Sequence, residues 1–337
     1  MQLLARFALF LPFVALLSCN NGTSQSAESK LIVAFGSCNQ HWNESQPIWK
    51  QIVKNEPDLW IWLGDIIYAD TDDMSEMKED YDTQKSHRDY NLLTAGTDVI
   101  GIWDDHDYGT NDGGKGYSQR DQSRDLLYDF LDVPLTSPDR KHSGAYQTYT
   151  YVNDDLLTKV ILLDVRYFRD DLDTDGTILG EEQWAWLTSH LENSEADIHV
   201  IGGGIQFLPQ EHRFEKWDNF PKERQRLIDI INKLNVSNPI LLSGDRHLAE
   251  MSLIQLKDNA KPLLEITSSG LTHSYRAFKS EANQHRIGPV VPSKNFGLLT
   301  IEKKNGKVTF IAEIRDDKNQ VQYSVSSDQL PTLMNQK

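Results

Sequence analysis

The stretch "GIWDDHDYGTND" at residues 101–112 places three carboxylates and one imidazole at four consecutive positions, from Asp104 to Asp107. The apolar residues 99–103 come directly before them. Crowded carboxylates repel one another and resist burial unless a cation or a proton offsets their charge. Carboxylate and imidazole groups are also frequent metal ligands. The stretch therefore predicts a cation site at the end of a buried strand.

Three further apolar runs, each typical of a strand buried on both faces, also end in side chains that can bind a metal. The runs and these side chains are residues 30–36 with Cys38, residues 58–63 with Asp65, and residues 239–243 with Asp245 and His247. The carboxyl ends of parallel strands line one crevice, where ligands bind. We therefore expect consecutive strands of one sheet to deliver these side chains to one place.

The remaining pattern predicts an α/β fold. Expected helices at residues 46–55 and 74–93 separate the first three strands, which is a βαβαβ order and implies a parallel sheet. Later strands are joined by short turns such as residues 304–307 and should be antiparallel. Further strands are expected at residues 145–152, 159–165, 198–207, 250–256, 263–267, 297–302 and 308–314, and further helices at 121–131, 181–193 and 222–234. This order fits two packed mixed sheets flanked by helices.

Composition restricts the possible partners. The 337 residues carry a formal net charge of −16 without a cluster of Lys and Arg, which argues against a nucleic-acid-binding surface. An anionic substrate would need a local positive charge, and a bound metal is the simplest source.

The first 19 residues are typical of a targeting segment. Arg6 precedes an apolar stretch at residues 7–17 that is short for a membrane span. The sequence "LLSC" resembles a bacterial lipobox, which would make Cys19 the lipidated first residue of an exported, membrane-anchored protein facing the periplasm or the cell surface. The alternative is an ordinary secretory signal in which this cysteine is incidental. Residues 20–30 then form a flexible tether, and residues 326–337 a disordered tail.

The chain contains one other cysteine, Cys38. If Cys19 carries a lipid, Cys38 has no disulfide partner. It is then a small buried hydrophobe, a metal ligand or a nucleophile.

The segments "GSC", "GDIIY", "WDDHDYGTND" and "SGDRH" together resemble the motifs of the alkaline phosphatase D (PhoD-like) family of calcineurin-like metallophosphatases. The segments "LDVRYFRD", "ILGEEQWAWL" and "TSSGLTHS" extend the resemblance over residues 31–314. It implies a four-layer αββα sandwich over residues 31–325. It also implies hydrolysis of phosphate mono- or diesters by metal-bound hydroxide at a dinuclear centre, with Fe³⁺ and often Ca²⁺.

The resemblance further implies a set of site residues. The ferric ion would be held by Cys38, Asp65, Tyr68 and His247. The second metal would be held by the bridging Asp65, by Asp245, and by Asp105 or alternatively Asn111.

Two residues are candidates for direct contact with the phosphate. His106 would act as a general acid or as a phosphate donor. Arg166 would either bind the phosphate through two N–H groups of its guanidinium, as a phosphate fork, or form a salt bridge with a nearby carboxylate. The carboxylates considered are Asp164, Asp170 and Asp171. Asp104 and Asp107 are expected to support the ligands or to cap a helix.

Residues 171–182, "DLDTDGTILGEE", match a calcium-loop pattern. A structural Ca²⁺ would be bound by Asp171, Asp173, Asp175, Thr177 and Glu182. The alternative is an acidic surface turn before a helix, whose first turn favours Glu.

A different class of function is also open: a catalytically silent lipoprotein of the same fold that captures phosphate or calcium. Every implied ligand position is, however, filled by a residue that can bind a metal. A decayed site would be expected to show an apolar residue at one of them, so the sequence favours an enzyme.

Overall fold

The computed structural model describes residues 29–172, 174–257 and 261–336. The predicted signal segment, Cys19 and most of the tether lie outside the described residues, as does Asp173. Within the described part of the chain, no helix is both long and apolar enough to cross a membrane.

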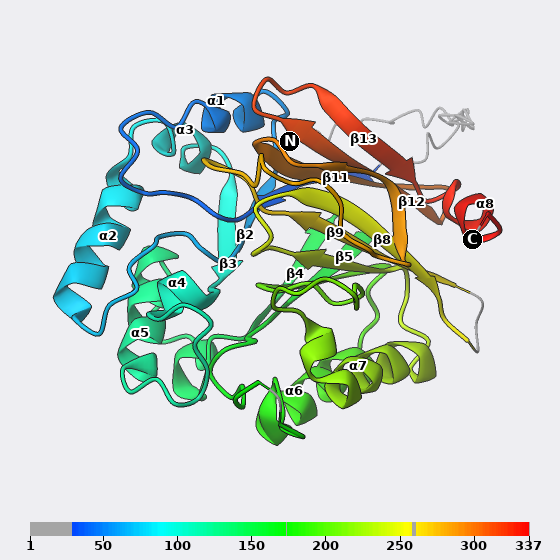
Figure 1. The fold of residues 1–337 in the computed structure, drawn as a ribbon. Helices are drawn as coiled ribbons and strands as arrows, with labels where there is room; N and C mark the ends of the chain where they lie inside the picture. The colour runs from blue at the N-terminus through cyan, green and yellow to red at the C-terminus, as the bar shows by residue number, and fades with distance from the viewer. Residues whose placement is uncertain (1–28, 173, 258–260, 337) are drawn as a thin grey trace, which may run out of the picture.

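Two mixed β-sheets face each other, and helices cover their outer faces, so the predicted four-layer α/β architecture is confirmed (Figure 1). The six-stranded sheet has the order β13-β12-β11-β1-β2-β3. Its strands are β1 (Ser29–Gly36), β2 (Leu59–Leu63), β3 (Asp98–Ile102), β11 (Asn295–Lys304), β12 (Lys307–Asp316) and β13 (Val321–Ser326). The seven-stranded sheet has the order β10-β8-β9-β7-β6-β5-β4. Its strands are β4 (Gln147–Asn153), β5 (Leu156–Leu163), β6 (Ile198–Gly203), β7 (Pro239–Ser243), β8 (Ala249–Gln255), β9 (Pro262–Ser268) and β10 (Arg286–Val291).

The helices fall into two groups (Figure 1). Beside the six-stranded sheet lie α1 (Ile48–Val53), α2 (Met74–Ser86), α3 (Asn91–Thr94), α4 (Asp105–Tyr108) and α5 (Arg120–Phe130). The seven-stranded sheet is covered by α6 (Gly180–Glu192) and α7 (Pro221–Lys233), and α8 (Leu330–Met334) ends the described chain. Short 3₁₀ helices lie at Pro138–Lys141 and Trp217–Asn219.

The predicted strand directions are confirmed for the first three strands and for the C-terminal hairpins. The expectation that all later strands are antiparallel was wrong, because β5, β6, β7 and β9 pair in parallel, with a helix between β5 and β6 and another between β6 and β7. β1 pairs in parallel with β2, and β2 with β3, so their carboxyl ends meet at one edge of the sheet. β11, β12 and β13 pair in antiparallel order. The β11–β12 turn uses Asn305 and Gly306, whose φ values of 54° and 76° match a two-residue hairpin turn.

Continuous apolar sequences become buried strands in the central part of each sheet, where both faces are covered, whereas β12 and β13 are partly exposed. All five residues of β2 are buried, and its Trp60 and Trp62 pack edge to face at 5.4 Å. A second apolar cluster lies between the seven-stranded sheet and its helices, where Trp184 and Trp217 are buried. This packing holds the strand ends rigidly.

Several expectations were wrong. β7 belongs to the seven-stranded sheet, so the loop after it does not follow a strand consecutive with β1, β2 and β3. The helix expected at residues 74–93 is interrupted, because His87 has an extended backbone (ψ 125°). The tail expected at residues 326–337 instead contains α8, whose Leu330 is buried. Ser29, assigned to the tether, begins β1.

Candidate metal centre

Four residues at strand ends share an unusual backbone. Their φ values are 62° for Cys38, 49° for Asp65, 66° for Asp245 and 54° for His247. Positive φ is uncommon for residues other than glycine, and such strained positions gather at functional sites. The left-handed conformation turns the chain sharply after β1, β2 and β7, so the two sheets direct side chains into one space.

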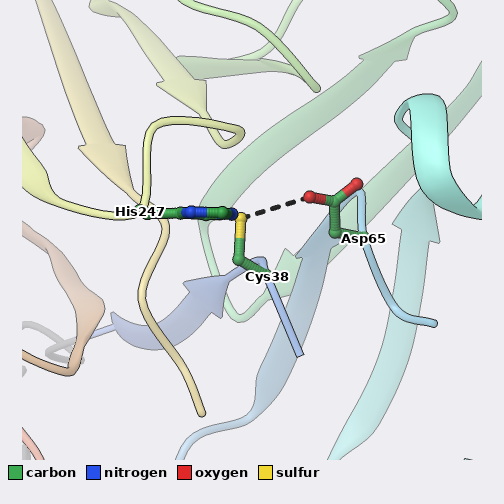
Figure 2. A group of neighbouring side chains, drawn as sticks. All are labelled: Cys38, Asp65 and His247. Atoms are coloured by element: carbon green, nitrogen blue, oxygen red, sulfur yellow. Dashed lines mark hydrogen bonds between the residues drawn. The ribbon is translucent and has the colours of Figure 1, made fainter. Parts of the chain in front are cut away.

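The first group of potential ligands is Cys38, Asp65 and His247, shown in Figure 2. Their ligand atoms all lie within 4.8 Å of one another, and the Cys38 thiol lies 3.3 Å from Asp65 Oδ2. The Tyr68 hydroxyl lies 3.1 Å from the same oxygen and 3.0 Å from His247 Nε2. The structure therefore brings together all four residues predicted for the first metal.

The second group is Asp65, Asp105 and His106, whose ligand atoms also lie within 4.8 Å of one another. Asp65 is common to both groups, as a bridging ligand must be. A pocket of about 510 Å³ opens over this region, lined in part by Asn111 and Asp245. Asp105 is thus placed in a ligand group, while Asn111 lies on the same pocket wall.

The electrostatics of the centre fit a bound cation. Burial, followed by the charge of Asp105, raises the pKa of Asp65 well above its usual range. Burial likewise raises the pKa of Asp245 to about 7, and it raises the pKa values of the Cys38 thiol and the Tyr68 phenol. Among the described residues, the buried Asp65 Oδ1 has no hydrogen-bond partner. Cations would stabilise these ionised groups and occupy the free oxygen.

Asp107 supports the ligands as expected. Its carboxylate accepts hydrogen bonds from the backbone N–H groups of Asp65 (3.2 Å) and Ile66 (3.1 Å). It also accepts one from the N–H of Asp104 (2.7 Å), within a capping box at the start of α4. One buried carboxylate therefore ties the loop after β2 to the loop after β3.

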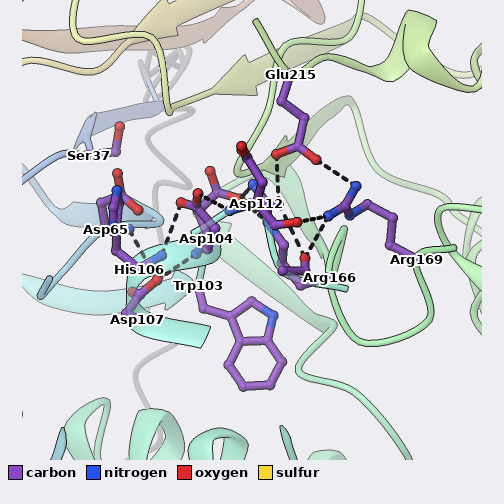
Figure 3. Close-up of polar contacts among 12 residues, drawn as sticks. Ser37, Asp65, Trp103, Asp104, His106, Asp107, Asp112, Arg166, Arg169 and Glu215 are labelled. Carbon is purple, nitrogen blue, oxygen red and sulfur yellow. Dashed lines mark hydrogen bonds and ion pairs between the residues drawn. The ribbon is translucent and has the colours of Figure 1, made fainter. Parts of the chain in front are cut away.

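A buried ion-pair network lies beside the centre (Figure 3). Arg166 is 0% exposed and pairs at 2.6 Å with Asp104 and at 2.6 Å with Glu215. Arg169 binds the other oxygen of Glu215 at 2.9 Å. The prediction that Arg166 forms a phosphate fork is therefore wrong, since its guanidinium does not reach the pocket.

The alternative salt bridge predicted for Arg166 was also assigned to the wrong partners. Only the backbone N–H of Arg166 contacts a predicted carboxylate, donating to Asp164 at 2.8 Å. Its guanidinium instead joins the loop after β3 to the segment after β6.

His106 lines the pocket and is oriented by a residue that the sequence reasoning missed. Its Nδ1 lies 2.6 Å from a carboxylate oxygen of Asp70. Burial lowers the pKa of His106, but the bond to Asp70 and the charge of Asp105 outweigh this and raise it overall. The Asp70 carboxylate therefore holds the imidazole in place at the pocket.

His273 is a second residue that was missed. Its Nε2 lies 3.1 Å from the Tyr68 hydroxyl and 3.1 Å from His247 Nε2. It belongs to the segment "TSSGLTHS", five residues after the end of β9. The pattern that predicted the other ligands, a metal-binding side chain shortly after a buried strand, also applies to His273.

The described residues of the predicted calcium loop make other contacts. Asp175 pairs with Lys222 at 3.0 Å, and Glu182 accepts a hydrogen bond from Tyr146 at 3.3 Å. The carbonyl of Thr177 accepts a bond from the N–H of Asp170 at 2.9 Å. No three described carboxylates of this loop lie close enough to share an ion, and Asp173 is outside the described residues. The contacts of the described residues favour the acidic turn, and the calcium site, which needs Asp173, stays a prediction.

A sequence model for PhoD-like phosphatases matches residues 33–323. The chain belongs to the PhoD-like phosphatase family. The match covers both sheets and every ligand position described above, which confirms the family predicted from the motifs.

Individual relatives agree with this assignment. Alkaline phosphatase D of Bacillus subtilis (strain 168) is 27% identical over 270 residues, which are 65% of this chain and 46% of the relative. The chain thus spans about half the length of that relative. A solved structure of PhoD superimposes with a TM-score of 0.69 and 21% identity, covering 88% of this chain and 68% of PhoD.

Two more distant structures share the fold. GAP50, described as the anchor in the inner membrane complex of Plasmodium, has a TM-score of 0.59 and 14% identity, covering 88% of each chain. A dimetal phosphatase from Danio rerio has a TM-score of 0.54 and 12% identity, covering 88% of this chain and 98% of its own. The αββα sandwich is therefore a framework used well beyond this family.

Proposed function

We propose that this PhoD-like protein is a metal-dependent hydrolase of phosphate mono- or diesters. The observation that carries the proposal is the sharing of Asp65 between two ligand groups beneath one open pocket. A phosphate-binding protein without activity needs neither a bridging carboxylate nor a polarised imidazole beside it. In this chain Asp65 is placed where it could bridge two metals, and Asp70 holds His106 at the pocket.

The two metals are proposed to be Fe³⁺ and Ca²⁺. Thiolate and phenolate ligands from Cys38 and Tyr68 suit a trivalent iron, whereas a site of carboxylate oxygens suits calcium. When bound, the two cations would draw the phosphate into an acidic protein, orient its oxygens and lower the pKa of an attacking water. In this assignment His106 is not a metal ligand. The chain would hold the phosphate against the ring of His106, which would give a proton to the departing oxygen.

Export and lipid anchoring through Cys19 form a separate part of the proposal. They rest on the sequence of the first 19 residues, which resembles a lipoprotein signal. A phosphatase anchored in this way would act on esters outside the cytoplasm.

The proposal is tested by metal analysis of the purified full chain together with a panel of phosphate mono- and diesters. We expect about one iron and one divalent ion per chain, and hydrolysis that is lost on chelation and restored by adding the metals back. A metal-loaded protein that binds phosphate but hydrolyses no ester would instead support the catalytically silent alternative.

Tyr68→Phe tests the identity of the first metal. The iron-loaded protein should be coloured through a phenolate-to-iron charge-transfer band, and the variant should lose that band because it lacks the hydroxyl lying 3.0 Å from His247. Tyr117→Phe removes a hydroxyl that donates to the carbonyl of Thr71 at 2.6 Å and belongs to neither ligand group, so this variant should keep the band. A fully active, colourless and iron-free wild-type protein would contradict the ferric assignment.

A further inference from the structure

The pocket above the metal centre has an apolar, aromatic side that the hydrolytic chemistry does not require. Phe214 and Tyr275 line it, and their rings meet edge to face at 6.2 Å and 77°. Both rings are half-buried. The lining also includes polar groups such as Asp105 and Asn111. The pocket therefore joins a phosphate-binding end to a surface suited to something flat and apolar.

Two guanidinium groups lie against this aromatic surface. Arg246 lies over the Phe214 ring at 4.5 Å, and Arg213 lies over it at 4.9 Å. Arg246 is buried and fixed by Gln206 and Glu281. Arg213 is exposed, and no carboxylate within the described ranges lies within 4.0 Å of it. Arginine planes and aromatic side chains are the two surfaces on which aromatic ligands stack.

The aromatic surface is held rigidly in relation to the metal centre. Glu215, the residue after Phe214, is fixed by Arg166 and Arg169, which Figure 3 shows converging on it. The backbone N–H of Tyr275 donates to the carbonyl of His247 at 2.6 Å, which ties this ring to a ligand loop. A preorganised surface of this kind binds a ring without the cost of ordering a loop.

We propose that Phe214, Tyr275 and Arg213 form a subsite for an aromatic ring carried by the phosphate substrate, so that the preferred esters are aryl or nucleoside esters and not alkyl ones. The inference rests on the proposed function only for the position of the phosphate. The ring would stack on this surface while its phosphate reaches the groups around Asp105.

The test measures binding by calorimetry to the metal-loaded full chain, using three phosphonates that carry the same charged group. These are phenylphosphonate, cyclohexylphosphonate of similar bulk, and methylphosphonate. We expect phenylphosphonate to bind about tenfold more tightly than cyclohexylphosphonate, a difference within the range that stacking on an aromatic surface supplies. Thymidine 5′-monophosphate distinguishes the two sources of the ring, because only a nucleoside subsite binds it as tightly as phenylphosphonate.

Phe214→Leu and Tyr275→Leu keep apolar volume but remove a ring, and each should reduce the preference for phenyl over cyclohexyl to about threefold or less. Tyr151 lies on the edge strand β4, outside the pocket, so Tyr151→Leu should keep the wild-type preference for phenylphosphonate over cyclohexylphosphonate. Equal binding of the two phosphonates by the wild-type protein, or a preference that survives in both pocket variants, would overturn the subsite. Hydrolysis without a ring preference overturns only this inference, whereas a ring preference without hydrolysis overturns only the proposed function.

Discussion

Asp65→Asn is expected to lower phosphatase activity by about three orders of magnitude, the equivalent of about 4 kcal/mol of transition-state stabilisation. The reason is that Asp65 is the carboxylate common to both ligand groups. An amide retains the shape but not the charge, and its nitrogen cannot bind a cation. Turnover of an ester substrate and the metal content of the same preparation are the two measurements.

The control for this prediction is Asp132→Asn. Asp132 is an exposed carboxylate that pairs with Lys85 at 2.6 Å, away from the centre. This variant should keep wild-type activity and metal content. Full metal content and most of the activity in Asp65→Asn would show that this residue does not bridge two metals.

Arg166→Met is expected to lower the free energy of unfolding by about 3–5 kcal/mol, because it leaves buried carboxylates without their cation. Asp104 and Glu215 both pair with this guanidinium at 2.6 Å. Urea denaturation followed by circular dichroism measures the change. Arg166→Lys keeps the positive charge but lacks the planar guanidinium that pairs with two carboxylates. This variant should fold, and its free energy of unfolding should lie between those of Arg166→Met and the wild type.

Arg226→Met is the matched control for this prediction. It breaks an ion pair with Glu181 at 2.5 Å, but that pair is exposed to solvent. Exposed pairs contribute about 0–1 kcal/mol, so the loss should be small. Equal losses in the two variants would mean that the buried network contributes no more than a surface pair.

Local pattern accounts for the part of the fold that was predicted correctly. The strands that precede Cys38, Asp65 and Asp105 are short apolar runs ended by Gly or polar residues. Such runs predict a buried strand from the local sequence alone, without knowledge of the strand with which it pairs. β10 and β13 were missed because they are partly exposed and lack a continuous apolar run. The interruption at His87 coincides with a break in the hydrophobic pattern, since residues 82–89 are all polar, and the expected helix was drawn across that break.

The sequence by itself therefore determined which residue types stand at the strand ends and the chemistry that they can perform. It identified the ligand-competent set around Asp65, because each member follows the end of a buried strand within a few residues. Contacts between distant segments carry no such local signal. That β7 joins the other sheet, that Arg166 turns to Asp104 and Glu215, and that His273 approaches Tyr68 all depend on how the two sheets pack. The aromatic side of the pocket was decided in the same way, since Phe214 and Tyr275 are 61 residues apart and meet only after the loops behind β6 and β9 close over the centre.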